Sequence, residues 1–309
     1  MSDSAFKPTI ANIAIVAPSG YAIDTLAYAN AINSLRAQGH VVHDFTASAE
    51  KFQRFAATDS ERLAHLHAAA SHPDVQLVLA LRGGYGLSRL LPQIDFDLLA
   101  NSGKRFVGHS DFTALQMGLL AQKGCVSIAG PMICDDFSRA DVSAFTMSHF
   151  WQCLSDSTYQ VSAHATGNPV MQTEGLLWGG NLSILAHLTG TRWMPAIKGG
   201  ILFIEDINEH PYRVERMLLQ LHHAGVLDQQ KAVLFGDFGP SRLSDYDNGY
   251  DFNAMLAYLR RQLRVPLLQG LPFGHIRDKV SLPVGAMALL DADAQGLTLS
   301  FSNNATLPV

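Results

Sequence analysis

A serine stands where a buried strand gives way to a helix. The stretch RFVGHSDFTAL passes from apolar residues through a glycine to His109, Ser110 and Asp111, and a helical pattern then begins. A hydroxyl on this turn would lie beside the free N–H groups and partial positive charge of a helix N-terminus. These are the parts of a nucleophile with an oxyanion hole, although Phe112 replaces the second glycine of the G-x-S-x-G pattern. A serine that only caps the helix is the alternative.

The loop RGGYG (residues 82–86) follows another apolar stretch of the chain. Paired glycines let the backbone come close to a ligand and expose N–H groups, so this loop could supply a second oxyanion donor. A tight turn and a phosphate-binding loop are the alternatives. The phosphate-binding loop is disfavoured because no Lys–Ser/Thr pair follows the glycines.

A nucleophilic serine needs a base, and the base needs an acid that orients it. His275, in LPFGHIRDK, lies in a loop between apolar stretches, where catalytic groups are often found. The stretch ILFIEDINEHP places Glu205 and Asp206 at the end of a buried strand, on opposite faces. A buried carboxylate requires a partner. For Glu205 that partner is either a histidine or one of Arg213 and Arg216.

Other histidines are weaker candidates for the base. His109 directly precedes the serine, and adjacent side chains point apart. His65 and His67 are two residues apart on a predicted helix and face different ways, which disfavours a metal pair. His222 and His223 come late on an amphipathic helix, where a solvated role is expected. No H-E-x-x-H sequence occurs, so no metal site is expected.

Composition narrows the class of protein. The 309 residues exceed the usual size of one core and predict two domains. The hydrophobic content of 48% fits a well-packed enzyme, and a net charge of −5 without a basic tract disfavours nucleic acid as a partner. Three cysteines without C-x-x-C spacing predict neither a zinc site nor disulfides, and they fit a cytoplasmic location. No apolar stretch predicts a membrane span, and TIANIAIVA is expected to be a strand rather than a signal peptide.

The first half of the chain alternates short apolar runs with amphipathic stretches. This alternation predicts an α/β fold, a doubly wound, mostly parallel sheet with helices on both faces. Ligands bind such sheets at the carboxyl ends of the strands, where the serine turn and the RGGYG loop both lie. We expect strands at residues 10–17, 41–45, 75–81, 105–108 and 126–130, and helices at residues 24–38, 58–70 and 111–122.

The second half contains more strands than the first. We expect strands at residues 201–207, 231–238, 285–292 and 296–302, and helices at 181–188 and 212–225, which together predict a mixed α+β or β-rich unit. Periodicity weakens between the two halves, where Gly167 and Pro169 interrupt the pattern. We therefore predict an N-terminal domain over residues 1–152, a linker over 153–174 and a C-terminal domain over 175–309.

Five blocks of the sequence together resemble the LD-carboxypeptidase family. They occur in the family order and span nearly the whole chain, from IVAPSGY at residue 15 to LPVGA at residue 286. The blocks are RGGYG, GHSDFTAL, TEGLLWGGNL, FIEDINEHPYRVERMLLQL and LPFGH…LPVGA. The resemblance implies a Ser–Glu–His triad made of Ser110, Glu205 and His275, with the serine in the N-terminal domain and the other two residues in the C-terminal one. It also implies an oxyanion hole formed by the backbone N–H groups of Asp111 and Gly84.

The resemblance further implies a reaction. The enzyme would hydrolyse the bond between the L-centre of a diamino acid and the C-terminal D-alanine of murein tetrapeptides, free or linked to a sugar or nucleotide. The resemblance implies no metal or organic cofactor, a cytoplasmic location and a homodimer. Whether the diamino acid is diaminopimelate or lysine is left open by the sequence.

The substrate ends in a carboxylate, which a cation or free N–H groups must recognise. Arg82, Trp178 and Asn181 are the candidate contacts, although Trp178 is equally suited to the core and Asn181 to capping a helix. Two other functions remain open. The chain could be a related microcin-immunity peptidase that cuts peptide–nucleotide conjugates, or a muropeptide-binding protein without catalytic activity.

Overall fold

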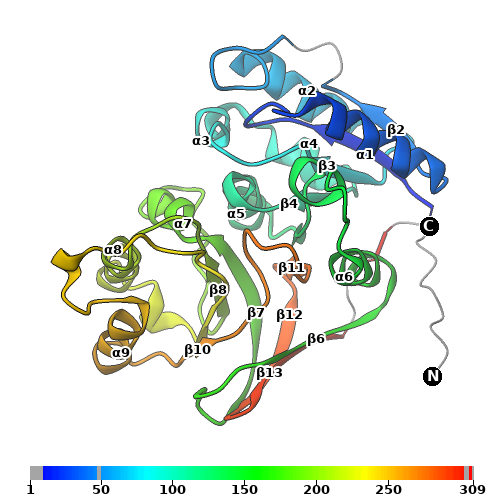
Figure 1. The fold of residues 1–309 in the computed structure, drawn as a ribbon. Coiled ribbons are helices and arrows are strands. Elements are labelled where there is room, and N and C mark those ends of the chain that lie inside the picture. Colours follow the sequence, from blue (N-terminus) through cyan, green and yellow to red (C-terminus); the bar gives the residue numbers. More distant parts are fainter. Residues whose placement is uncertain (1–9, 47–49, 303–305, 308–309) are drawn as a thin grey trace.

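The protein is built around two β-sheets that share one continuous hydrophobic core. A computed structural model describes residues 10–46, 50–302 and 306–307 (Figure 1). The six-stranded sheet forms most of the upper lobe in this view, and the seven-stranded sheet forms the lower one. No helix within these described ranges is long and apolar enough to cross a membrane.

The six-stranded sheet has the order β11-β5-β4-β3-β1-β2. All neighbouring strands are parallel except β11, which runs antiparallel to β5. This arrangement confirms the predicted doubly wound, mostly parallel sheet. The strands are β1 (Asn12–Val16), β2 (Val41–Asp44), β3 (Leu77–Ala80), β4 (Arg105–Gly108), β5 (Ser127–Ala129) and β11 (Leu282–Val284).

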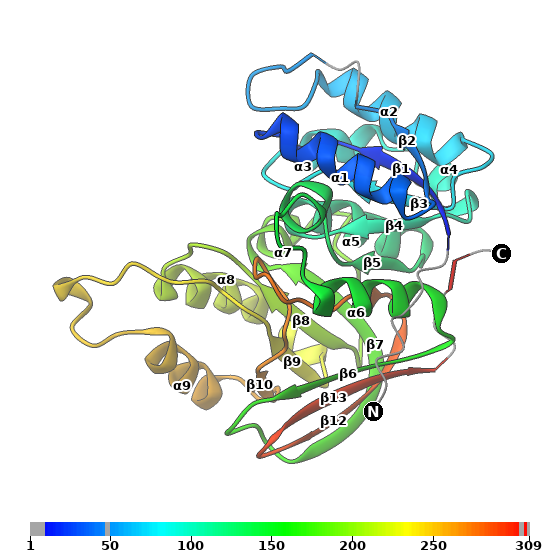
Figure 2. The same ribbon diagram turned by 45° about the vertical axis from the view of Figure 1, so that its right-hand side comes forward.

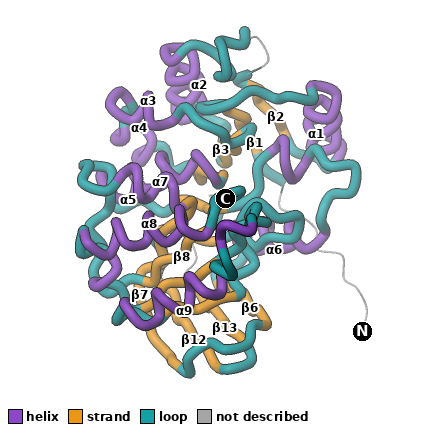
Figure 3. The backbone as a smooth tube through the Cα atoms, turned by 60° about the vertical axis from the view of Figure 1, so that its left-hand side comes forward, coloured by secondary structure: helices purple, strands orange, loops and turns teal. Residues whose placement is uncertain are grey.

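Helices cover both faces of this sheet, with α1 on one side and α2 and α4 on the other (Figure 3). Helix α2 begins at a capping box in which Thr58 and Glu61 bond to each other's backbone N–H groups, as its spacing predicts. The helices of this lobe are α1 (Thr25–Ala37), α2 (Asp59–Ser71), α3 (Leu87–Leu90), α4 (Phe96–Asn101), α5 (Thr113–Lys123) and α6 (Ala144–Ser155).

The seven-stranded sheet has the order β10-β9-β8-β7-β12-β13-β6. Strands β7 to β10 are parallel, and β12, β13 and β6 extend the sheet in antiparallel fashion, which confirms the predicted mixed unit. The strands are β6 (Thr158–His164), β7 (Met171–Asn181), β8 (Ile201–Glu205), β9 (Ala232–Phe235), β10 (Leu267–Gln269), β12 (Met287–Asp293) and β13 (Gly296–Ser302). The helices are α7 (Leu182–Leu188), α8 (Pro211–His223) and α9 (Phe252–Gln262), which lie beside the parallel strands (Figure 2).

Two segments lie elsewhere than the sequence analysis expects. Residues 153–174 are not a linker throughout, because they include β6, in which Tyr159 and Val161 point into the core between outward-facing polar residues. Strand β11 comes from the predicted C-terminal domain but completes the six-stranded sheet. The chain therefore crosses between the two sheets more than once, and the domain boundaries themselves stay a prediction.

The end of β7 packs tightly against both β8 and α5. The backbone N–H of Asn181 donates to Oγ1 of Thr113 at 3.1 Å, which joins β7 to the first residue of α5. Gly179 has φ +132°, and a Cβ there would collide with the carbonyl oxygen of Phe203 on β8. The two glycines of WGGN therefore allow the close approach of strands from which the site is built.

This packing predicts that Gly179→Ala lowers the free energy of unfolding much more than Gly190→Ala, the matched control. Gly190 also has positive φ, but a Cβ there meets nothing within 4 Å. Left-handed backbone alone costs about 1–2 kcal/mol, and forced overpacking adds about 1–3 kcal/mol. Urea denaturation of both variants measures the difference. Equal losses would contradict the tight approach of β7 to β8.

Candidate active site

Ser110 lies on a strained turn at the carboxyl end of β4. It begins a single 3₁₀ turn (Ser110–Phe112) that leads into α5, and its φ is +61°. A left-handed conformation at a residue with a Cβ costs about 1–2 kcal/mol and is typical of a nucleophile turn. No side chain caps this turn or α5, so Ser110 does not serve as the helix cap. Its side chain is half-buried.

The RGGYG loop lies directly against the serine hydroxyl. A Cβ on Gly83 would come within 2.7 Å of both Cβ and Oγ of Ser110, closer than real side chains allow. The next residue, Gly84, is exposed, and a Cβ there would meet nothing within 4 Å. Only a glycine at position 83 permits this contact, and the loop beyond it opens to solvent beside the serine.

Asp111 holds the loops around the serine through its side chain. Its buried carboxylate accepts a hydrogen bond from Oγ of Ser19 at 2.6 Å and from the backbone N–H of Leu87 at 2.9 Å. Burial raises the pKa of Asp111, and these hydrogen bonds oppose that rise. The sequence analysis assigned only the backbone N–H of Asp111 a role. The position of Asp111 on the turn gave no signal that its side chain joins loops far apart in the chain.

Glu205 and His275 form a direct hydrogen bond. Nδ1 of His275 donates to Oε2 of Glu205 at 2.8 Å, and Glu205 has no exposed surface at the end of β8. Burial lowers the pKa of His275, but the hydrogen bond and charge of Glu205 raise it by more, so the net pKa lies above its usual value. Because Nδ1 carries the proton, Nε2 is left as the nitrogen that can accept one.

The serine turn and the His275 loop meet at His109. Its ring lies edge-on to that of His275, with 5.1 Å between ring centroids. Nδ1 of His109 donates to the carbonyl oxygen of Gly130 at 2.9 Å. Burial, together with the positive charges of Lys279 and His275, holds the pKa of His109 well below its usual range. His109 is therefore a neutral, buried neighbour of His275.

The three predicted substrate contacts have different surroundings. Trp178 is fully buried and its Nε1 donates to Gln230 at 2.9 Å, so its prediction as a substrate contact is wrong and its core role is confirmed. Trp178 pairs with Leu202 on β8, and its ring lies within the continuous hydrophobic core. Arg82 is half-buried on the RGGYG loop, where its Nη1 donates to the carbonyl oxygen of Tyr21 at 3.2 Å. Its role toward substrate stays a prediction.

The side chain of Asn181 hydrogen-bonds to Glu205 and caps α7. Its Oδ1 accepts the backbone N–H of Ile184 at the start of α7, and its Nδ2 donates to Glu205 at 3.3 Å and to Asp206 at 3.1 Å. Both donors of the amide are then used, and only 6% of the residue is exposed. The capping role is confirmed, and the contact with substrate stays a prediction. Arg213, the alternative partner for Glu205, instead lies 3.6 Å from Glu209.

The loop that carries His275 is fastened to the other half of the chain. Lys279 and Asp136 form a buried ion pair at 2.8 Å, with only 1% and 2% of their side chains exposed. Nearby, the Thr146 hydroxyl donates to the carbonyl oxygen of Arg277 and accepts the backbone N–H of Lys279. The sequence analysis missed this ion pair because its members are 143 residues apart (279 − 136). The available signal was Asp136 inside the largely apolar run PMICDDF, where a buried charge would need a partner.

Comparisons with known proteins agree with this geometry. The LD-carboxypeptidase N-terminal domain family matches residues 13–130, and the LD-carboxypeptidase C-terminal domain family matches residues 174–290. This chain belongs to the LD-carboxypeptidase family. The family resemblance inferred from the five sequence blocks is thereby confirmed.

Three proteins similar to this LD-carboxypeptidase have names that state an activity or a function. The crystal structure of muramoyltetrapeptide carboxypeptidase from Oxalobacter formigenes is 52% identical, with a TM-score of 0.90 over 94% of this chain and 98% of that one. Murein tetrapeptide carboxypeptidase of Pseudomonas aeruginosa is 29% identical over 94% of this chain and 97% of its own length. Microcin C7 self-immunity protein MccF of Escherichia coli is 25% identical over 79% of each chain.

The pairing with Glu205 predicts the titration of His275. In Glu205→Gln the carboxylate charge is lost while burial remains, so the pKa of His275 should fall below its wild-type value. Only the neutral ring can accept a proton from the serine, so wild-type activity should rise with pH and level off above the pKa of His275. The raised pKa moves this rise to higher pH. NMR titration of the histidine ring protons measures the pKa of His275 in both proteins, with the other histidines as internal references. An unchanged pKa of His275 in the variant would show that Glu205 does not raise it.

The buried ion pair predicts strong coupling between Lys279 and Asp136. Lys279→Met alone leaves a buried carboxylate without its partner and should lower the free energy of unfolding by about 3–5 kcal/mol. Asp136→Leu should cost a similar amount, whereas the double variant should recover most of the loss. Urea denaturation of the four proteins gives the double-mutant cycle. Additive losses would show that the two charges do not interact.

Proposed function

We propose that this LD-carboxypeptidase hydrolyses the bond between a diamino acid and the C-terminal D-alanine of murein tetrapeptides. Ser110 is the nucleophile, His275 the base and Glu205 the acid that orients it. The hydrogen bond between His275 and the fully buried Glu205, beside the strained serine turn, is the observation that carries this proposal. The relatives named for murein tetrapeptides support the substrate.

The proposed mechanism uses only groups of this chain and water. Nε2 of His275 takes the proton from Oγ of Ser110 as that oxygen attacks the scissile carbonyl. The backbone N–H groups of Asp111 and Gly84 stabilise the oxyanion, and the Glu205 carboxylate stabilises the imidazolium. His275 then gives the proton to the departing amine of D-alanine. Water, deprotonated by the same imidazole, releases the peptide from Ser110.

The surroundings of the triad support an enzyme rather than a binding protein alone. A strained φ at Ser110 and a buried Glu205 both cost stability, and their partners match those of an activated serine. A site that only bound peptide would need neither. The homodimer, the cytoplasmic location and the division into domains at residues 152 and 175 stay predictions, and the two family matches support the division.

Loss of the nucleophile tests the proposal. Ser110→Ala should lower kcat for D-alanine release from a tetrapeptide by roughly 10⁴- to 10⁶-fold, because the remaining site can only bind and polarise the substrate. Mass spectrometry of the peptide before and after incubation, with chelator present, measures the reaction. Ser300→Ala on β13 removes a half-buried hydroxyl far from the triad and should keep full activity.

Two further results complete this test. Adding His275→Ala to Ser110→Ala should cause little further loss, since the two groups act as one unit. A folded Ser110→Ala protein that releases D-alanine at a near-normal rate would overturn the proposal. Cleavage of a peptide–nucleotide conjugate, with no cleavage of tetrapeptide, would favour the alternative activity suggested by the name of the microcin C7 self-immunity relative.

A further inference from the structure

A hollow of about 510 Å³ opens beyond the carboxyl end of β8. Most of its lining comes from the stretch NEHPYR (residues 208–213), which begins two residues after Asp206. This stretch is part of the family resemblance, yet the triad uses none of its side chains. The rest of the lining comes from the loop after β9. The lining residues are Asn208, His210, Tyr212, Arg213, Pro240 and Arg242.

Both loops around the hollow are anchored beside the triad. The backbone N–H of Asp206 donates to the carbonyl oxygen of Asp237 at 3.3 Å, and the N–H of Asp237 donates to that of Phe273 at 2.8 Å, on the loop that carries the base. Asn208 is three residues beyond Glu205, which places their Cα atoms at most about 11 Å apart. The lining therefore begins within about 11 Å of the carboxylate that holds His275, a span that a few peptide residues cover.

The hollow presents cations that are incompletely neutralised. Arg213 faces Glu209 at 3.6 Å, and 52% of its side chain is exposed. Arg242 is exposed and lies within ion-pair distance of no carboxylate among the described residues. Both ring nitrogens of His210 are already used, one by a backbone N–H and the other by Asp247 at 3.0 Å. The two guanidinium groups are therefore the positive charges available to a ligand.

We infer that Arg213 and Arg242 bind a carboxylate of the peptide substrate. Guanidinium groups form paired, charge-assisted hydrogen bonds with carboxylates. The Tyr212 hydroxyl, which accepts a hydrogen bond from Nε of Arg213 at 3.3 Å, steadies that side chain at the rim. The side-chain amide of Asn208 adds a further donor to the lining.

This inference rests on the proposed function and adds a basis for its substrate preference. Diaminopimelate carries a side-chain carboxylate that lysine lacks, and the terminal alanine supplies the other nearby carboxylate. Arginine side chains in the hollow would favour a peptide whose carboxylate reaches them. The two sources share one chemistry and are separated by the choice of peptide.

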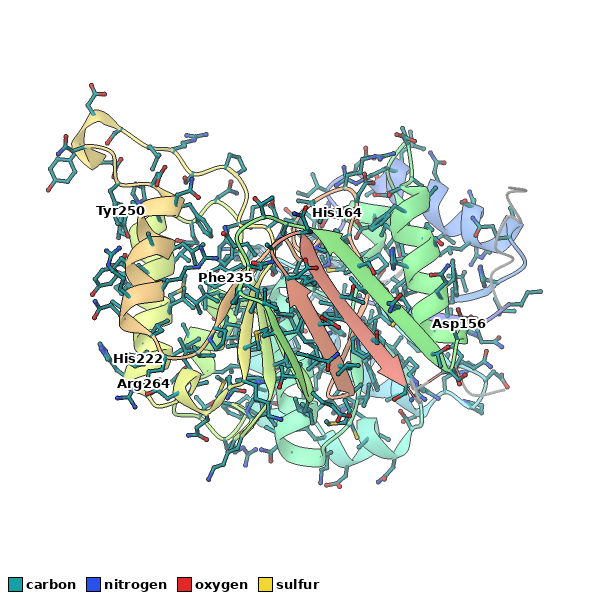
Figure 4. All side chains as sticks on the ribbon, turned by 90° about the horizontal axis from the view of Figure 1, so that it is seen from below. Asp156, His164, His222, Phe235, Tyr250 and Arg264 are labelled. Atoms are coloured by element: carbon teal, nitrogen blue, oxygen red, sulfur yellow. The ribbon has the colours of Figure 1, made fainter. Side chains whose placement is uncertain are left out.

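The test measures binding apart from turnover. Calorimetry on Ser110→Ala protein gives Kd for three tetrapeptides, one with diaminopimelate, one with lysine, and one with diaminopimelate and an amidated C-terminus. Adding Arg213→Ala or Arg242→Ala should raise Kd for the first peptide roughly tenfold, the effect of losing one charge-assisted hydrogen bond. Arg242→Lys keeps the charge and should fall between. Arg264→Ala is the matched control, since Arg264 is an exposed arginine just beyond the end of α9 and does not line the hollow (Figure 4).

The pattern of losses identifies the carboxylate. An arginine effect that disappears with the lysine peptide assigns the side-chain carboxylate, and one that disappears with the amidated peptide assigns the C-terminal one. Either result supports the inference. Kd values equal to those of the Arg264→Ala control for all three peptides would overturn it, while D-alanine release by the unsubstituted enzyme would leave the proposed function standing. Binding that depends on the arginines, without any release of D-alanine by the unsubstituted enzyme, would support the inference and contradict the proposed function.

Discussion

A carboxylate with no exposed surface is the constraint on which this structure depends. Glu205 ends a strand buried on both faces, and removing its charge from water is unfavourable unless partners replace the lost hydration. Its two oxygens are satisfied by His275 and Asn181. One partner comes from a loop that leads into the other sheet, and the second begins α7. The need to satisfy one buried charge thus holds His275 at the end of β8.

The seam between the two sheets is the place where the site must form. Strand β11 belongs to the six-stranded sheet, and the orange segment between β10 and β11 carries His275 from one sheet to the other (Figure 1). The buried pair of Lys279 and Asp136 holds this segment against the N-terminal half. Isolated ion pairs of this kind add little net stability, but they penalise any arrangement that separates the charges. Here the penalty acts on the position of His275 relative to Ser110.

The serine side of the seam depends on close approach rather than on charge pairing. Ser110 keeps a left-handed backbone because Gly83 packs against its hydroxyl and the Asp111 carboxylate holds the surrounding loops. Strain at one residue is maintained by several contacts that do not themselves react. Exposed loops surround this turn, including the loops after β8 and β9 that line the hollow with Arg213 and Arg242. Close contacts hold the strained turn in place, whereas exposed loops form its surroundings.

The sequence by itself determined the alternating α/β half and the mixed second half, and it singled out Ser110, Glu205 and His275 as candidates for nucleophile, acid and base. Hydrophobic periodicity and short motifs are local properties, so they are visible without the fold. Tertiary structure alone decided that β6 lies within the expected linker and that β11 joins the first sheet. It alone also decided that Trp178 is enclosed and that Asn181 turns both donors toward acidic side chains. Such outcomes depend on contacts between residues far apart in the chain, and no local pattern specifies which distant groups will satisfy a buried atom.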